Sequence, residues 1–203
     1  HQPSPPTDPQ PLSKPHSSSS IDPSNTRPNH ISSYYKNTIE QWAILNPLLL
    51  EHSQPNCHII YLHNSDETTI KKEFDRNGFD SNTLLNNHTL ELYHTHDSYL
   101  INGVFIANRM FKFWQERIAA AQSKGINKIF LTGEMGWALQ DKPGCENLHV
   151  YEAQLNKLLQ TLPEVTVLCQ YSLTEFSSKD IIESVCTHPH VQVKNQLLKI
   201  IHL

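Results

Sequence analysis

Residues 128–139 read Lys-Ile-Phe-Leu-Thr-Gly-Glu-Met-Gly-Trp-Ala-Leu, and this stretch decides the fold that we expect. Its apolar start predicts a buried strand, and the glycine and acid that follow place the carboxylate of Glu134 at the end of that strand. Residues 147–162 then carry leucines at helical spacing, which predicts a helix after the turn. In open α/β sheets, ligands bind outside the carboxyl ends of the strands. We therefore expect Glu134 to lie where a ligand would bind.

Strand and helix patterns alternate along the chain from residue 30 onward. Strand patterns cover residues 30–35, 57–62, 89–94, 127–132, 165–171 and 191–193. Helix patterns cover residues 37–52, 65–78, 105–123, 147–162 and 177–187, and we expect Asn37 and Ser65 to cap the first two helices. Strands that alternate with helices are joined by crossovers, which produce a parallel sheet covered on both faces. We predict an α/β fold, a three-layer sandwich with a mostly parallel sheet.

Length and composition limit the domain organisation and the kinds of partner. A chain of 203 residues suits one domain plus a tail. Residues 1–29 are rich in Pro and Ser, which predicts a disordered tail or linker, and residues 30–203 are expected to form the α/β domain. A net charge of -4 with scattered Lys and Arg argues against direct contact with nucleic acid. No apolar run approaches the roughly 18 residues that a membrane span needs, so we expect no membrane contact.

The four cysteines, Cys57, Cys145, Cys169 and Cys186, form no CxxC pair. Cys57 and Cys169 fall inside predicted buried strands, where a thiol packs as a small apolar group. We interpret all four as free thiols in a reducing compartment, and we predict a cytoplasmic protein.

Polar and aromatic side chains follow several predicted strands at the same edge of the sheet. His63 ends the second strand, and Tyr171 ends the fifth. His94 and His96 lie at the end of the third strand. In a parallel sheet these side chains converge with Glu134, which is typical of a ligand site. The alternative is that residues at such an edge are polar because they are solvated.

The segment His94-Thr-His96-Asp97 invites a metal interpretation, because imidazole and carboxylate groups bind zinc and iron. A closed site needs further ligands, which only Glu134 or His63 could supply. A chain with 13 His also produces an HxH pattern by chance. We therefore expect no metal and no cofactor.

Sequence motifs for nucleotide binding and for nucleophilic catalysis are absent. The chain has neither GxxxxGK[ST] nor GxGxxG, so we expect no binding of ATP through a phosphate loop. No serine lies in a GxSxG turn. Trp137 is interpreted as the floor of an apolar pocket, although it could equally cover the core. His188-Pro-His190 is interpreted as the turn that ends a helix rather than as a metal site.

Six ordered motifs resemble the MEDS family, the methanogen/methylotroph DcmR sensory domain. They are His30-Ile-Ser-Ser-Tyr-Tyr35, Tyr99-Leu-Ile-Asn-Gly-Val-Phe105, Gly133-Glu-Met-Gly-Trp-Ala-Leu139, Tyr151-Glu-Ala-Gln-Leu-Asn156, Leu168-Cys-Gln-Tyr171 and His188-Pro-His-Val191. The resemblance spans about residues 30–195, and Ser32 stands where the family usually has Cys. It implies a RecA/KaiC-like sandwich that lacks the phosphate loop. It also implies detection of a small one-carbon or halogenated compound, with output through a histidine kinase, a transcription regulator or a fused domain.

Residue patterns and resemblance together predict a small-molecule sensing domain of a signalling or transcription-regulatory system. We expect the ligand at the carboxyl edge of the sheet, where it would shift the population of loop arrangements that a partner reads. The predicted ligand-binding residues are His30, Tyr35, His94, His96, Glu134, Trp137, Glu152 and Tyr171. The alternative is a hydrolase or transferase that uses Glu134 as general base with a nearby His, with or without a metal. We favour the binding domain over the enzyme.

Overall fold

The structure, a computed structural model, describes residues 28–194 and 196–200. Its strands are β1 (His30–Tyr35), β2 (Cys57–His63), β3 (Leu90–His94), β4 (Lys128–Glu134), β5 (Val165–Ser172), β6 (His190–Val193) and β7 (Gln196–Lys199). Its α-helices are α1 (Thr38–His52), α2 (Glu67–Arg76), α3 (Ser81–Asn86), α4 (Ala107–Ser123), α5 (Leu148–Leu159) and α6 (Ser178–Thr187). Single 3₁₀ turns cover Thr95–Asp97, Ile101–Gly103, Met135–Leu139 and Cys145–Asn147.

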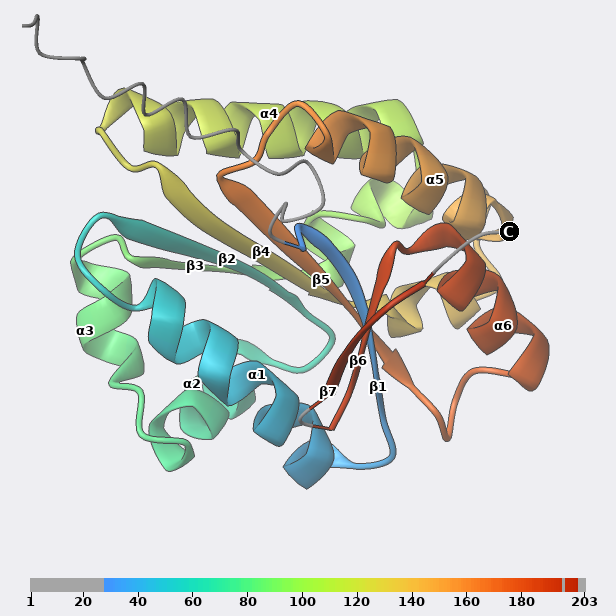
Figure 1. The fold of residues 1–203 in the computed structure, drawn as a ribbon, viewed down its shortest axis with the longest axis horizontal. Coiled ribbons are helices and arrows are strands. Elements are labelled where there is room, and N and C mark those ends of the chain that lie inside the picture. The colour runs from blue at the N-terminus through green and yellow to red at the C-terminus, as the bar shows by residue number, and fades with distance from the viewer. Residues whose placement is uncertain (1–27, 195, 201–203) are drawn as a thin grey trace, which may run out of the picture.

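The elements form three layers, as Figure 1 shows, with the sheet in the middle, α1 to α3 below it and α4 and α5 above it. The strand order is β3-β2-β4-β5-β1-β6-β7. Every neighbouring pair is parallel except β6 and β7, which are antiparallel. The predicted α/β sandwich with a mostly parallel sheet is therefore confirmed.

Apolar side chains fill the space between the sheet and each helical layer. The layer below the sheet includes Trp42 and Leu45 of α1, Ile70 and Phe74 of α2, and Leu84 of α3. The layer above it includes Met110, Trp114 and Ile118 of α4, Leu148 and Leu155 of α5, and Ile181 and Val185 of α6. Both faces of the sheet are therefore covered by helices, and loops from different crossovers meet at its carboxyl edge.

Local hydrogen bonds correct some of the predicted boundaries. Asn37 caps α1 as predicted, because its side chain accepts a hydrogen bond from the Glu40 N–H at 3.0 Å. The predicted Ser65 cap of α2 is wrong. Asp66 is the cap, since its carboxylate accepts both the N–H and the hydroxyl of Thr69. The sequence patterns missed α3 and β7, which at six and four residues are too short to show a period.

The segment 1–29, predicted to be a tail or linker, lies outside the described residues except for its last two positions. The carbonyl of Asn29 accepts the Val167 N–H at 2.8 Å, and its side-chain amide donates to the Leu159 carbonyl at 2.6 Å. The described chain is thus attached to β5 and α5 just before β1 begins. No helix in residues 28–194 and 196–200 is long and apolar enough to cross a membrane.

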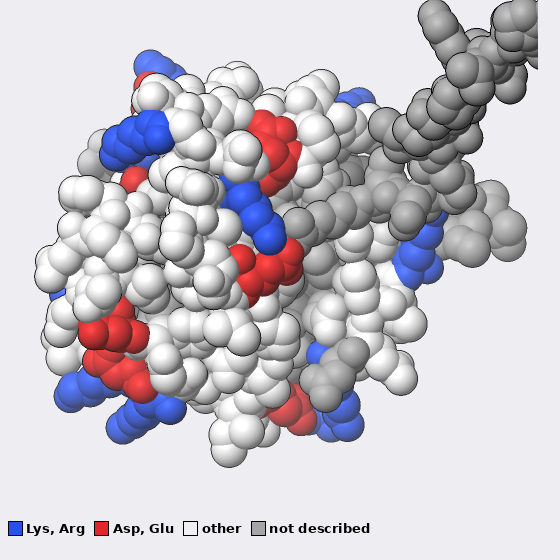
Figure 2. Space-filling model, turned by 60° about the vertical axis from the view of Figure 1, so that its left-hand side comes forward, with Lys and Arg blue, Asp and Glu red and all other residues white. Residues whose placement is uncertain are grey.

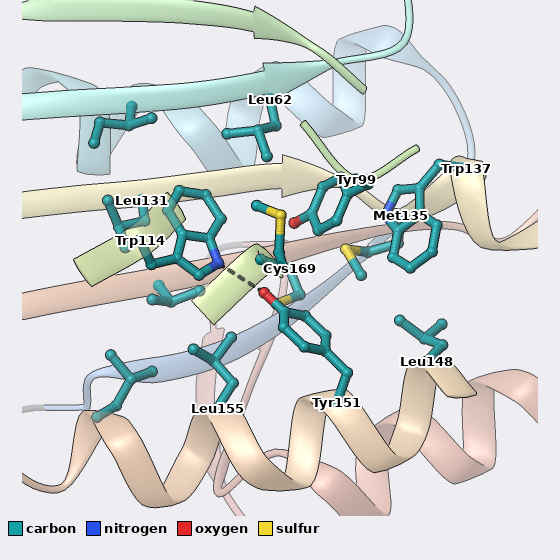
Figure 3. Close-up of a cluster of buried hydrophobic side chains, with 14 of the residues drawn as sticks. Leu62, Tyr99, Trp114, Leu131, Met135, Trp137, Leu148, Tyr151, Leu155 and Cys169 are labelled. Atoms are coloured by element: carbon teal, nitrogen blue, oxygen red, sulfur yellow. Dashed lines mark hydrogen bonds between the residues drawn. The ribbon is translucent and has the colours of Figure 1, made fainter. Parts of the chain in front are cut away.

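The position of Gly133 in β4 is fixed by a close approach of Tyr99. The ring of Tyr99 stacks on Trp137 with centroids 4.5 Å apart, and both lie inside the upper core in Figure 3. A Cβ atom at Gly133 would lie 2.5 Å from the Tyr99 hydroxyl oxygen and 3.3 Å from its ring. A side chain at Gly133 would therefore displace the aromatic stack.

We predict that Gly133→Ala lowers the free energy of unfolding by about 1–3 kcal/mol, because a methyl group would overpack the contact with Tyr99. Urea unfolding followed by circular dichroism measures the change. In a Tyr99→Phe background the closest atom is removed, and the cost of Gly133→Ala should fall. An equal cost in both backgrounds would contradict the contact as the cause.

Candidate functional site

A crevice lies at the carboxyl edge of the sheet, between the ends of β2 and β4. After β2 the chain enters α2, which packs below the sheet, and after β4 it leads to α5, which packs above it. The connections of two neighbouring strands therefore diverge to opposite faces. Such a divergence is where open α/β sheets bind ligands. The crevice thus lies at the edge of the sheet for which the sequence predicts a ligand site, and that site stays a prediction.

The crevice has a volume of about 330 Å³. Its walls come from the loops after β2, β3, β4 and β5, and they are formed by Asn64, His94, Thr95, His96, Gly136, Leu139, Gln140 and Glu175. Imidazole, amide and carboxylate groups thus face one small space together with a single exposed leucine. This combination suits a small molecule that forms hydrogen bonds.

Hydrogen bonds fix the orientation of His94 and leave His96 more open. The Nδ1 atom of His94 accepts the His96 N–H at 3.1 Å, so its Nε2 carries the proton and donates to the Asn64 carbonyl at 3.1 Å. Thr95 donates its hydroxyl to the Asn64 side chain at 2.9 Å. The exposed His96 ring has one long contact, 3.5 Å to the Gln140 amide. His94 therefore builds the wall, and His96 is available to a ligand.

Glu134 holds the loop that lines the crevice. One carboxylate oxygen accepts the Asn64 N–H at 2.9 Å, and the other accepts the Tyr61 hydroxyl at 3.0 Å. Burial raises the pKa of Glu134, and these two hydrogen bonds oppose that rise. Glu134 is not among the residues that line the crevice. Its carboxylate joins the end of β4 to the turn after β2.

The eight predicted ligand-binding residues lie in different places. His94 and His96 line the crevice. Glu134 and Tyr35 lie nearby, at the ends of β4 and β1, and Trp137 lies in the upper core. The other three, His30, Glu152 and Tyr171, form part of a second, buried cluster. Trp137 is fully buried, with the rings of Tyr99 and Phe105 each 4.5 Å from its own. Its indole covers the core and does not line the crevice.

The second cluster centres on Glu152, which has no exposed surface. Its Oε2 atom lies 3.1 Å from His30 Nε2, 3.3 Å from His188 Nε2 and 3.4 Å from Cys169 Sγ. Its Oε1 atom accepts the Tyr171 hydroxyl at 3.4 Å. The imidazole rings of His30 and His188 are 4.2 Å apart. Four elements of the fold thus meet at one carboxylate.

Burial and mutual attraction set the charges in this cluster. Burial, then the neighbouring His188, lower the pKa of His30 from 6.5 to about 4. Burial alone would raise the pKa of Glu152, but attraction to His188 and His30 outweighs it and holds that pKa well below its usual range. Burial and the Glu152 charge raise the pKa of Cys169. The cluster therefore contains an ionised carboxylate in the interior, a strongly perturbed group of the kind found at functional sites.

Sequence reasoning missed two members of the cluster. Cys169 was interpreted as a core thiol, and it does lie inside β5. His188 was interpreted as a helix-ending turn, and it does follow α6 directly. Both positions are correct, but neither pattern shows that the two side chains face Glu152.

Charged side chains do not form a single-sign surface on the face drawn in Figure 2, where Lys and Arg alternate with Asp and Glu. Several of them are paired on the surface, such as Lys128 with Glu51 at 2.8 Å. This face has no feature that favours nucleic acid.

The sequence matches the family "MEDS: MEthanogen/methylotroph, DcmR Sensory domain" over residues 29–189. The chain belongs to this family. The resemblance found in the motifs is therefore confirmed. The chain is also similar to the transcriptional repressor DcmR of Methylorubrum extorquens (strain DSM 6343 / CIP 106787 / DM4), with 32% identity over 74 residues. That match covers 36% of this chain and only 28% of the repressor.

Solved structures with the same fold come from Pyrococcus horikoshii. The KaiC-like protein PH0186 has a TM-score of 0.52 and 10% identity, and the match covers 82% of this chain and 71% of that one. The uncharacterized protein PH0321, solved in complex with an unknown peptide, has a TM-score of 0.63 and 14% identity, with 86% and 84% covered. At these identities the likeness shows the fold alone. The predicted RecA/KaiC-like fold is confirmed.

The MEDS domain has no room for a phosphate loop between β1 and α1, because only Lys36 and Asn37 join them. The N-terminus of α1 is already occupied by its own side chains. Asn37 accepts the Glu40 N–H, and the Glu40 carboxylate accepts the Lys36 N–H at 2.8 Å. A carboxylate in the first turn repels phosphate where a phosphate loop would bind it.

We predict no saturable binding of ATP with magnesium, because β1 runs into α1 without a glycine-rich turn and Glu40 adds negative charge there. Isothermal titration calorimetry of the full chain measures it. Micromolar affinity would overturn this prediction.

We predict that Glu134→Gln lowers the free energy of unfolding by about 1–3 kcal/mol without any ligand. The amide can accept only one of the two hydrogen bonds that the carboxylate accepts from Asn64 and Tyr61. Thermal and urea unfolding measure the change. The matched control Glu175→Gln alters an exposed carboxylate at the same edge and should stay within about 0.5 kcal/mol of the parent. An unchanged free energy of unfolding in Glu134→Gln would contradict this role and favour direct contact of Glu134 with a ligand.

Proposed function

We propose that this MEDS domain is a sensory domain that binds a small molecule in the crevice between β2 and β4. The observation that carries the proposal is the position of the crevice. It lies where neighbouring crossovers diverge, and four separate loops supply its polar walls. A ligand here contacts all four loops at once, so its binding free energy acts on their relative positions.

The proposed mechanism is a population shift of the loops after β3 and β4. His96 lies in the 3₁₀ turn after β3, and Gly136 and Gln140 lie in and just after the turn that follows β4. A ligand that bonds to His96 and Gln140 favours the arrangement in which both turns face it. A partner protein or a fused domain of a signalling or transcription-regulatory system reads that arrangement. The four cysteines are free thiols, which favours the cytoplasm as the compartment.

Glu134, Tyr35 and His94 lie around this site and do not contact the ligand in this proposal. Glu134 and His94 both bond to the backbone of Asn64, at its N–H and its carbonyl. Burial, and then the nearby carboxylates of Glu134 and Glu175, raise the pKa of Tyr35 at the same edge. Glu134 and His94 fix the walls, and His96, Gln140 and Glu175 are left to recognise the ligand.

The alternative of a hydrolase or transferase has no comparable support. A general base must come within hydrogen-bond reach of its substrate. The Glu134 side chain does not line the crevice, and hydrogen bonds from Tyr61 and Asn64 hold its carboxylate toward the protein. We therefore retain only the sensory function.

The proposal is tested by NMR titration of the ¹⁵N-labelled full chain with methanol, methylamine, formate and halomethanes. We expect at least one compound to shift the amide signals of His96, Gly136 and Gln140. No binding by any of them, or shifts confined to other parts of the chain, would contradict the proposed site.

We predict that His96→Ala weakens the binding of that compound about tenfold, the effect of one lost hydrogen bond of about 1.4 kcal/mol. Stability should change little because the side chain is exposed. Asp97→Ala is the matched control, since it alters the exposed neighbour that does not line the crevice. Equal affinities of the two variants would remove His96 from the site.

A further inference from the structure

Three metal-ligating side chains converge on Glu152, and neither they nor Glu152 line the crevice. We propose that His30, Glu152, Cys169 and His188 form a buried site for a zinc ion. The ligand atoms offered by these four residues all lie within 4.8 Å of one another. This proposal is independent of the ligand proposed for the crevice.

The spacing of the donor atoms fits tetrahedral coordination. Zinc bonds of ~2.0–2.3 Å to nitrogen, oxygen and sulfur imply donor atoms about 3.3–3.8 Å apart at the corners of a tetrahedron. The distances from Glu152 Oε2 to the nitrogens of His30 and His188 and to Cys169 Sγ are 3.1, 3.3 and 3.4 Å. Cys169 Sγ lies 3.8 Å from His30 Nε2. A small closure of the side chains would bring all four onto one ion.

The charges of the four ligands match a zinc ion in a fully buried place. A thiolate from Cys169 and the carboxylate of Glu152 together carry two negative charges, and the two neutral imidazoles add none. A divalent cation makes the group neutral.

Outer contacts orient two of the four ligands, His188 and Glu152, in the way that second-shell groups orient zinc ligands. His188 directs Nδ1 at the Ser184 carbonyl at 2.7 Å, which leaves Nε2 to face the cluster. That Nε2 atom lies 3.3 Å from Glu152 Oε2 but has no hydrogen-bond geometry with any described group. Tyr171 donates to the other oxygen of Glu152. An imidazole nitrogen that faces a carboxylate without bonding to it is positioned for an ion between them.

A cavity beside the cluster provides a path for an ion. It has a volume of about 400 Å³, and its walls include Asn29, Asn156 and Pro189. Asn29 and Pro189 are the chain neighbours of His30 and His188. The cluster is thus buried from bulk solvent but lies directly behind the wall of this cavity.

The test uses the full chain, purified without chelator and then stripped and reloaded with Co²⁺ as a spectroscopic substitute for Zn²⁺. We expect one ion per chain by elemental analysis, a near-ultraviolet sulfur-to-cobalt charge-transfer band and the intense visible bands of four-coordinate Co²⁺. We also expect Zn²⁺ to raise the melting temperature of the stripped protein. Affinity should rise with pH, because binding releases the Cys169 proton.

Two Cys→Ser substitutions distinguish an effect at the metal site from a general effect of losing a buried thiol. Cys169→Ser should abolish the charge-transfer band and weaken Co²⁺ binding at least tenfold. Cys57→Ser, which alters a buried thiol in β2 outside the cluster, should leave both unchanged. If Cys169→Ser does not fold, the spectrum and stoichiometry of the parent chain decide. No stoichiometric metal in the parent, a cobalt spectrum without a sulfur band, or equal effects of the two substitutions would overturn the proposal.

Discussion

The burial of one carboxylate constrains the centre of this fold. Glu152 has no contact with solvent, and its oxygens contact groups from β1, β5 and the residue that follows α6. An ionised group in the interior is tolerated only when several partners surround it. The positions of α5 and of the chain after α6 are therefore tied to the register of β1 and β5, in which Ser32 faces Cys169. Moving any one of these elements would remove a partner from the buried Glu152 carboxylate.

The carboxyl edge depends on a second carboxylate with a different task. Glu134 ends β4, and its carboxylate accepts the N–H of Asn64 in the loop after the neighbouring strand β2. The carbonyl of the same residue accepts the Nε2–H of His94, the last residue of β3. The ends of β3 and β4 are thereby joined to the loop after β2, and the crevice is the space beside them. A Cβ at Gly136 would lie 3.0 Å from the Asn64 side-chain amide, so the Asn64 side chain would have to shift to admit it.

Periodicity and turn residues in the sequence predicted the strands and the edge of the sheet where the crevice lies. The apolar runs gave all the parallel strands, and glycine followed by Glu134 marked the edge where the crevice lies. Contacts between distant positions could not be predicted in the same way. His30 and Glu152 are 122 residues apart, and their meeting depends on strand order and on the face to which α5 packs. A pattern of buried residues in β5 indicates that Cys169 is inside without showing what it faces.

The motifs that carry the family resemblance contain the four cluster residues, which the periodicity of the sequence does not connect. Each of the four cluster residues falls in a different one of them, at residues 30–35, 151–156, 168–171 and 188–191. As secondary structure, these motifs read as two strands, a helix and a helix end, with nothing to connect them. Taken as a set, they supply two imidazoles, a thiol and a carboxylate, which is a composition typical of a zinc site.

The fold also explains why the chemistry lies away from the start of α1. In P-loop proteins the first strand leads through a glycine-rich turn to a helix whose N-terminus binds phosphate. Here that turn consists of Lys36 and Asn37 alone, Asn37 accepts the Glu40 N–H, and Glu40 accepts the Lys36 N–H. The connection is short and contains no glycine, and the Glu40 carboxylate opposes the charge of Lys36, so it does not form the anion-binding turn of a P-loop. The same sheet still has diverging crossovers between β2 and β4, and that geometry does not require a phosphate loop. The RecA-like sheet of this chain therefore lacks a phosphate loop after β1 and has a crevice beside β4, two strands away.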